Sequence, residues 1–172
     1  YRLALLDDPR ARAVLEKTAE MADWAERGPG GEGQGIGIAF ARYKNMAAYT
    51  AVAVAVTVAE EVTLDHVWSA SDAGLVINPD GARNQLEGGI VQAASFALKE
   101  QVQIGGDGIA SRDWDSYPIL RFSEVPPVDV ALIGLPNDPS LGMGECTVGP
   151  TCAAIGNALA HALDRRIYDM PL

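Results

Sequence analysis

The sequence has 172 residues, of which 48% are hydrophobic and 21% are charged, so it is long enough for one folded domain and too apolar for a disordered tail. Its formal net charge is −10, with 13 Lys and Arg against 23 Asp and Glu, and this balance argues against a nucleic-acid partner, which needs a basic surface. The most apolar stretch, residues 46–59, is too short to span a bilayer and rich in β-branched residues. We therefore expect a strand there and no transmembrane segment in this chain.

Cysteine and histidine are too few and too scattered to predict a metal site. Cys146 and Cys152 form neither a C-x-x-C redox motif nor a zinc-ligand set. His66 and His161 lie far from them in the sequence. We expect free thiols and no metal ligand from this chain. The first residue is Tyr1 and not methionine, which suggests that further residues precede it.

Residues 8–28 have the pattern of a first helix. Asp8 is a typical N-cap, Pro9 suits the first helical position, and Gly28 is expected to end the helix. The expected inward-facing stripe consists of Val14, Thr18, Met21 and Ala25.

The glycine-rich loop that follows contains a G-x-G-x-x-G match at Gly28, Gly30 and Gly33. A dinucleotide-binding fingerprint needs a strand before it and a helix after it. Here a helix comes first and a strand is expected to follow, so a flexible connector is the preferred interpretation.

Alternating hydrophobicity predicts strands in the next part of the chain. The expected strands cover residues 35–43, 48–60, 62–74 and 74–78. In the second of them, valine alternates with alanine or threonine, which is typical of a sheet that packs on both faces. Glu60 and Glu61 suit a hairpin turn, and short turns between successive strands imply antiparallel pairing.

A second helix is predicted for residues 78–100, with Asn78 as its N-cap and Pro79 at its first position. Its expected apolar stripe consists of Leu86, Ile90, Ala93 or Ala94, and Ala97. Residues 101–110 are expected to form a hairpin, with Gly105, Gly106 and Asp107 in its turn.

A last strand at residues 128–135 and a final helix at residues 150–166 complete the prediction. The apolar side of that helix is expected to consist of Ala154, Ile155, Ala158, Leu159 and Ala162. The expected fold class is α+β, an antiparallel sheet with helices packed on it.

Gly88 and Gly89 break the usual rules near the middle of the second helix. Each glycine costs about 1 kcal/mol relative to alanine in a helix interior, so something should compensate. The pair could let another backbone or a flat ligand come into contact, with Gln85 on the same face to donate and accept hydrogen bonds. Alternatively, the glycines allow tight packing against a helix or sheet, and Gln85 simply lies at the surface.

Glu145 is the second place where the sequence invites a functional interpretation. It follows Gly142 and Gly144 in "LGMGECTVGPTC", residues 141–152, just before the final helix. A carboxylate held there could serve as a base whose pKa is raised by burial. It could equally be an exposed loop residue, or a helix-start residue that favours the positive end of the dipole.

The order of these blocks closely resembles one family. The sequence carries N-P-x(5)-Q-x-E-G-G at residues 78–89 and G-x-G-E at residues 142–145, and the two blocks together are far more specific than either alone. They resemble the C-terminal part of the molybdenum-binding large subunit of the xanthine dehydrogenase and aldehyde oxidase family. The most similar branch is the bacterial isoquinoline 1-oxidoreductase and nicotinate dehydrogenase type.

The resemblance implies roles for the residues that match these blocks. Glu145 matches the family's general base, which takes a proton from a metal-bound hydroxyl while hydride passes from substrate to a sulfido ligand. Gln85 matches the glutamine that contacts the pterin. Gly88 and Gly89 would let the helix lie close to the cofactor or to a neighbouring backbone. Gly142 and Gly144 would leave room around the base.

The same resemblance implies cofactors and partners outside this chain. The cofactor would be molybdenum–molybdopterin cytosine dinucleotide, and electrons would leave to iron–sulfur clusters on a partner. The implied partners are the remainder of the large subunit, a 2Fe–2S small subunit and, as a further candidate, a cytochrome c subunit. The substrate class would be a small aromatic N-heterocycle or an aldehyde. The compartment, bacterial periplasm or cytoplasm, is not specified by the sequence.

We expect residues 1–172 to form one C-terminal cofactor-binding domain or fragment. Its parts are a leading helix (1–28), a sheet with an inserted helix (36–135), and a segment with the catalytic glutamate followed by the final helix (141–172). Family members usually continue G-x-G-E with proline, whereas Cys146 follows here, either as a cofactor neighbour or as a small buried filler. A non-enzymatic assembly module without cofactor is the alternative. A hydrolase has little support because no G-x-S-x-G or P-loop motif occurs.

Overall fold

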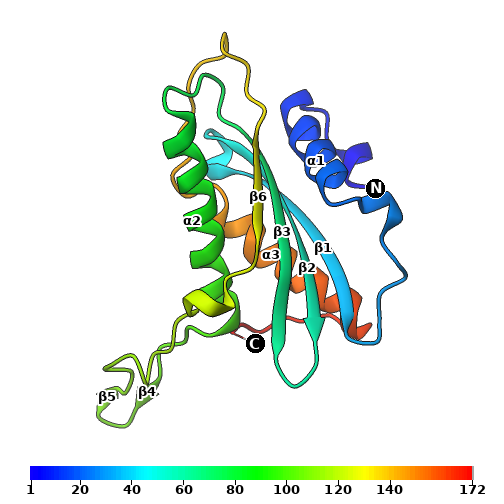
Figure 1. Ribbon diagram of the computed structural model, residues 1–172. Coiled ribbons are helices and arrows are strands. Elements are labelled where there is room, and N and C mark those ends of the chain that lie inside the picture. The colour runs from blue at the N-terminus through cyan, green and yellow to red at the C-terminus, as the bar shows by residue number, and fades with distance from the viewer. Residues whose placement is uncertain (172) are drawn as a thin grey trace.

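The computed structural model describes residues 1–171, which form a four-stranded sheet covered by helices on both faces (Figure 1). The strand order is β1-β2-β3-β6. The strands are β1 (Gln34–Arg42), β2 (Tyr49–Val58), β3 (Val62–Asp72) and β6 (Val128–Leu132). The helices are α1 (Pro9–Met21), α2 (Pro79–Leu98) and α3 (Val148–Leu163). Short 3-10 turns cover Arg2–Leu5, Trp24–Glu26, Tyr43–Asn45 and Phe122–Glu124.

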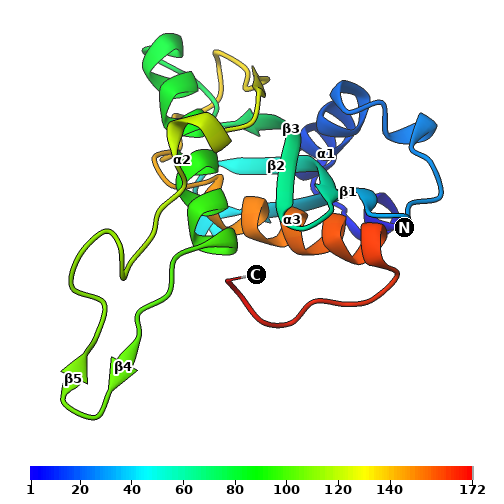
Figure 2. The same cartoon turned by 60° about the horizontal axis from the view of Figure 1, so that its bottom comes forward.

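Helix α1 covers one face of the sheet, and α2 and α3 cover the other (Figures 1 and 2). The alternation in β2 divides its side chains between these faces. Val52, Val54 and Val56 pack with α2 and α3, whereas Ala51 and Ala53 pack under α1. The prediction of a sheet that packs on both faces is confirmed.

The α+β class is confirmed, but the prediction of a purely antiparallel sheet is wrong at one strand. β1 pairs antiparallel with β2, and β2 pairs antiparallel with β3. β6 pairs with β3 in parallel, from Val67 with Val128 to Ser71 with Leu132. The reason lies in the connection, because the long crossover that contains α2 lets β6 enter the sheet in the same direction as β3.

Residues 74–78, predicted as a strand, form an irregular loop instead. Gly74 adopts a φ of +64°, and a Cβ built on it would lie 2.2 Å from the Pro139 carbonyl oxygen. The Leu75 N–H donates to the Asp138 carbonyl at 3.0 Å. These contacts with residues 138–139 replace strand pairing.

Helices α1 and α2 begin at their predicted N-caps, but α1 does not end at the predicted residue. Asp8 accepts hydrogen bonds from the backbone of Arg10 and Ala11, and Asn78 accepts one from Gly81. Helix α1 ends at Met21 rather than Gly28, because Asp23 adopts a left-handed φ of 45°. Its buried residues are Ala11, Val14, Leu15 and Thr18, so the predicted stripe is wrong at Met21 and Ala25.

The remaining predicted elements are present. The predicted stripes of α2 and α3 are buried. β4 (Ile104–Gly105) and β5 (Gly108–Ile109) form the predicted hairpin, which extends away from the sheet in Figure 2. The glycine-rich loop precedes a strand, as expected, and is tied to the end of α3 by a hydrogen bond from the Gly31 N–H to the His161 carbonyl at 2.9 Å. No helix within residues 1–171 is long and apolar enough to cross a membrane.

Helix α3 lies directly on the backbone of β1, at two glycines. A Cβ built on Gly37 would lie 2.2 Å from both the Ala154 carbonyl oxygen and the Ala158 nitrogen. A Cβ on Gly35 would lie 2.3 Å from the Ala158 carbonyl oxygen. Real Cβ atoms do not approach backbone atoms this closely, so only glycine fits at these positions.

Side chains of α3 also form hydrogen bonds with main-chain groups on the outer edge of β1. Asn157 Nδ2 donates to the Ile38 carbonyl at 3.1 Å, and the Ile36 N–H donates to His161 Nδ1 at 3.1 Å. These bonds occupy main-chain groups that an edge strand would otherwise present to another chain. They also account for His161 as a structural residue.

Gly37→Ala should therefore destabilise the protein. The added methyl group would collide with helix backbone, which cannot rotate away, and we expect a loss of about 3 kcal/mol or failure to fold. Gly28→Ala is the matched control, because nothing lies within 4 Å of a Cβ there, and it should change stability by less than about 0.5 kcal/mol. Urea unfolding of both variants measures the difference, and equal midpoints would contradict the close contact.

Candidate functional site

Glu145 lies in the segment that joins β6 to α3, three residues before the helix begins. Two backbone bonds fix this segment to the sheet. The Leu141 N–H donates to the Ala73 carbonyl at 2.9 Å, and the Ala48 N–H donates to the Gly142 carbonyl at 3.0 Å. The segment is thus held between the end of β3 and the β1–β2 connection.

The carboxylate of Glu145 accepts a hydrogen bond from the Tyr43 hydroxyl, with 2.5 Å between the oxygens. This bond raises the pKa of the Tyr43 phenol above its ordinary value. Both side chains meet in an exposed setting, so within the described residues Glu145 matches the alternative of an exposed loop residue. Tyr43 was not among the predicted site residues, because a tyrosine at the end of a strand carries no local signal of its partner.

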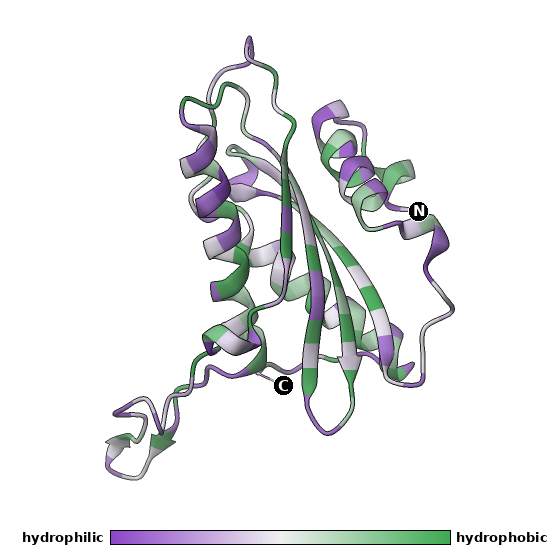
Figure 3. Ribbon diagram, viewed as in Figure 1, coloured by the Kyte–Doolittle hydropathy of each residue, from purple (hydrophilic) through white to green (hydrophobic). Residues whose placement is uncertain are grey.

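Gln85 lies next to the same segment. It is exposed on α2, and a Cβ built on Gly144 would be 3.8 Å from Gln85 Oε1. One residue further along α2, the Leu86 carbonyl accepts a hydrogen bond from the Thr147 hydroxyl at 3.2 Å. The fold therefore brings the two predicted motifs together. The first turns of α2 are largely hydrophilic in Figure 3.

The two adjacent glycines of α2 have different surroundings. Gly89 is buried, and a Cβ there would lie 2.3 Å from the Thr147 hydroxyl oxygen. Tight packing against this chain therefore explains Gly89. Gly88 is exposed and has no atom within 4 Å of a built Cβ, so packing within the described residues does not explain it.

The glycines before Glu145 are not required by backbone conformation. Neither Gly142 nor Gly144 is among the residues with positive φ, so the freedom of glycine at left-handed angles is not used. A Cβ on Gly142 would meet nothing within 4 Å. That these glycines leave room beside Glu145 stays a prediction.

Cys146 is a small buried filler, next in the chain to Glu145. It is 1% exposed and packs with Ala48, Ala73 and Leu86. Burial raises the pKa of its thiol, and hydrogen bonds with neighbouring hydroxyl groups act in the opposite direction. Cys146 and Cys152 are both free, as predicted.

The chemistry of the site is that of hydrogen-bonding groups rather than metal ligands. Residues 1–171 contain no group of three or more His, Cys, Asp and Glu side chains that could hold a metal ion. Near Glu145 they offer a carboxylate, a phenol, the amide of Gln85 and the open helix surface at Gly88. Such a surface fits the edge of a flat, polar cofactor that carries its metal with it.

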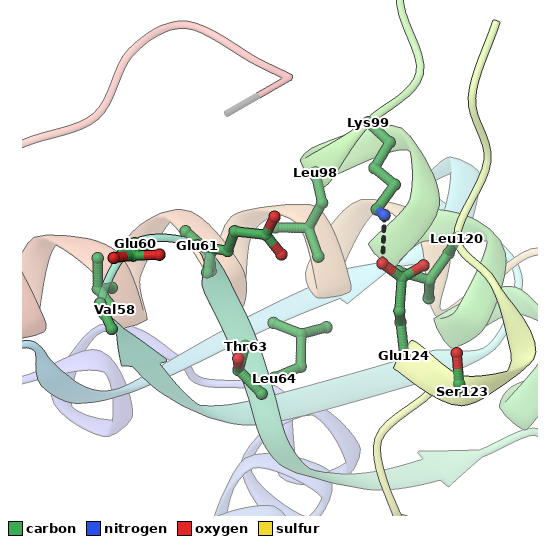
Figure 4. Close-up of a pocket in the computed structure, with 12 residues that line it drawn as sticks. Val58, Glu60, Glu61, Thr63, Leu64, Leu98, Lys99, Leu120, Ser123 and Glu124 are labelled. Carbon is green, nitrogen blue, oxygen red and sulfur yellow. Dashed lines mark hydrogen bonds and ion pairs between the residues drawn. The ribbon is translucent and has the colours of Figure 1, made fainter. Parts of the chain in front are cut away.

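A cavity of about 530 Å³ lies elsewhere, at the C-terminal end of α2 (Figure 4). Leu64, Leu98 and other apolar side chains line its interior, and Glu61 faces it from the β2–β3 turn. The ion pair of Lys99 with Glu124 lies at its rim. None of the residues that line it belongs to the predicted site.

Comparison with known proteins identifies the class. Residues 8–126 match the molybdopterin cofactor-binding domain, and the chain belongs to this family. The predicted resemblance is therefore confirmed. Gln85, Gly88 and Gly89 lie within the matched residues, whereas Glu145 lies beyond them.

The similar proteins are components of oxidoreductases. A nicotinate dehydrogenase subunit of Pseudomonas putida is 37% identical over 100% of this chain and 16% of its own length. The beta subunit of isoquinoline 1-oxidoreductase from Brevundimonas diminuta is 34% identical over 100% of this chain and 22% of its own length. Among solved structures, quinoline 2-oxidoreductase from Pseudomonas putida 86 has a TM-score of 0.64 and 25% identity, over 68% of this chain and 16% of that one. The chain thus spans about a fifth of the relatives' length or less.

The aldehyde oxidoreductase of Desulfovibrio gigas has the same fold over 72% of this chain, with a TM-score of 0.63 and 26% identity. The match covers 14% of that protein. These likenesses agree with the α+β class and with a sheet that is mostly antiparallel.

Alanine at Gly88 and Gly89 should have opposite effects on stability. Gly88→Ala should raise the free energy of unfolding by up to about 1 kcal/mol, because it improves an exposed helix position at no steric cost. Gly89→Ala gains the same propensity but displaces the Thr147 hydroxyl, and should lower stability by about 1 kcal/mol.

Thermal and urea unfolding of the two variants test this expectation. The double variant Gly89→Ala/Thr147→Ala should lose less stability than the sum of the losses in the two single variants, because the new methyl group no longer collides with the Thr147 hydroxyl. Equal effects of Gly88→Ala and Gly89→Ala would contradict the asymmetry.

Proposed function

We propose that this chain is the part of a molybdenum hydroxylase large subunit that presents a general base and one contact to the cofactor. Glu145 is the proposed base and Gln85 the proposed contact. The observation that carries the proposal is that, in a chain of the molybdopterin-binding family, the Gln85 amide lies beside Gly144, the residue before Glu145, although the two segments are far apart in the sequence.

The cofactor of the whole enzyme would be molybdenum–molybdopterin cytosine dinucleotide. Gln85 can both donate and accept hydrogen bonds, which suits the ring edge of a pterin. Gly88 lacks a side chain on the exposed surface of the same helix, so a flat group could come within contact distance of the backbone there. When bound, the cofactor would supply the two-electron oxidation.

Glu145 would accept the proton of the water that provides the new oxygen atom. A carboxylate suits this task because it is ionised at neutral pH and can hold a proton during turnover. The substrate would be an N-heterocycle or an aldehyde, hydroxylated at an electron-poor carbon. Gly142 and Gly144 would leave room for it beside the base.

Electrons would leave through another polypeptide. A 2Fe–2S cluster is commonly held by four cysteine ligands, and this chain has two cysteines. A small subunit with iron–sulfur clusters is therefore the proposed partner, together with the remainder of the large subunit, and a cytochrome c subunit is a further candidate.

One observation favours a second candidate function. Glu145 and Gln85 are exposed on the surface of this chain, as they would be in an assembly or subunit-contact module that has kept the fold without a cofactor. The two functions differ in what happens when the proposed residues are changed.

Replacement of Glu145 tests the catalytic role. Glu145→Gln keeps the size of the side chain but cannot accept the proton, so turnover of the complete enzyme should fall at least about 100-fold. Molybdenum content should stay near that of the unmodified enzyme. Steady-state kinetics and metal analysis measure the two quantities, and near-normal turnover would refute the role as base.

Replacement of Gln85 tests the cofactor contact. Gln85→Ala should weaken retention of the cofactor, by the loss of hydrogen bonds of about 1 kcal/mol each. Asn84→Ala is the matched control, because Asn84 is the preceding amide on α2 and is also exposed. Molybdenum retained after extended dialysis should fall in the Gln85 variant alone. Equal retention in both variants would contradict the contact.

A further inference from the structure

We propose that Tyr43 is a positioning residue for Glu145. Its hydroxyl donates a hydrogen bond to Glu145 Oε2, which holds the carboxylate in one orientation. This inference rests on the proposed function of Glu145 as general base, and it adds a residue from a distant part of the chain to the site.

The backbone of Tyr43 is held firmly in place. Tyr43 is the first residue after β1, and its N–H donates to the Ala48 carbonyl at 3.0 Å. Its own carbonyl accepts from the Ala47 N–H at 2.9 Å. Since the Ala48 N–H in turn binds the Gly142 carbonyl at 3.0 Å, Tyr43 and the segment of Glu145 are joined through a single residue.

The ring of Tyr43 is also fixed. It packs against the buried cluster that contains Ala48, Leu86 and Cys146, so its apolar part has a defined place. The Lys44 ammonium lies 5.2 Å from the ring centroid, within the range of a cation–π contact. A side chain with both its ring and its backbone fixed can orient a partner better than a mobile surface tyrosine could.

The hydrogen bond between these two side chains has a defined direction. The Tyr43 hydroxyl donates and Glu145 Oε2 accepts. The same bond raises the pKa of the Tyr43 phenol, so Tyr43 remains a protonated donor at neutral pH.

Loss of the Tyr43 hydroxyl should therefore lower turnover of the complete enzyme. In Tyr43→Phe the carboxylate of Glu145 is no longer held in one orientation, so kcat should fall about tenfold while KM stays near normal. A purely structural role would lower molybdenum content or melting temperature together with kcat.

A second tyrosine provides the matched control. The Tyr117 hydroxyl donates to Glu100 at 2.8 Å, so Tyr117→Phe removes the same kind of bond away from the site. This variant should leave kcat unchanged. Molybdenum content and melting temperature of both variants check that the fold and the cofactor are intact.

A spectroscopic measurement tests the bond without reference to turnover. Fluorotyrosine placed at position 43 of the complete enzyme reports ionisation of the phenol by fluorine NMR. In a Glu145→Gln background the phenol should ionise at lower pH than with Glu145 present, because the carboxylate that raises its pKa is gone. This measurement decides the question even if Tyr43→Phe fails to fold.

The outcomes separate the two proposals. Near-normal turnover of Glu145→Gln would refute the proposed function itself. If Glu145→Gln is inactive, a normal kcat in Tyr43→Phe, or fluorotyrosine that titrates identically with and without Glu145, would overturn the role of Tyr43 alone. A reduced kcat with retained molybdenum, together with phenol ionisation at lower pH in the Glu145→Gln background, would support it.

Discussion

Helix α3 packs directly on the backbone of β1, and this contact determines where the segment before the helix can lie. Gly35 and Gly37 leave no side chain between strand and helix, and the helix presents Ala154, Ala158 and Ala162 to them. Because α3 starts three residues after Glu145, the position of the helix on the sheet largely fixes the position of the carboxylate.

The other constraint on Glu145 comes from α2 and from the β1–β2 connection. The Thr147 hydroxyl donates a hydrogen bond to the Leu86 carbonyl and occupies the space that a side chain at Gly89 would need. The Gly142 carbonyl accepts a hydrogen bond from the Ala48 N–H. The site is thus a junction of three segments, each held by the sheet or by another helix. Its carboxylate and amide nevertheless face outward, which suits a domain that completes its site against other parts of a larger enzyme.

Local features of the sequence predicted much of this fold. Asp8 and Asn78 start their helices by capping backbone groups, which depends on a few neighbouring residues. Strand direction depends instead on the path of the chain, so the parallel pairing of β6 was not predictable from alternation. The roles predicted for Glu145 and Gln85 came from the family resemblance and not from a local pattern. Tyr43 could not be found in this way, because it is 102 residues from its partner and no local pattern links the two.

We propose that this chain serves a molybdenum hydroxylase, and chemical analysis of the whole enzyme tests this directly. Molybdenum and released cytosine nucleotide should be measured on the full-length native protein, purified with whatever copurifies. We expect about one molybdenum and one cytosine nucleotide per large chain, together with an iron–sulfur partner. Absence of both from a properly matured preparation would contradict it, and would leave Gln85 and Glu145 as inherited scaffold in an assembly module.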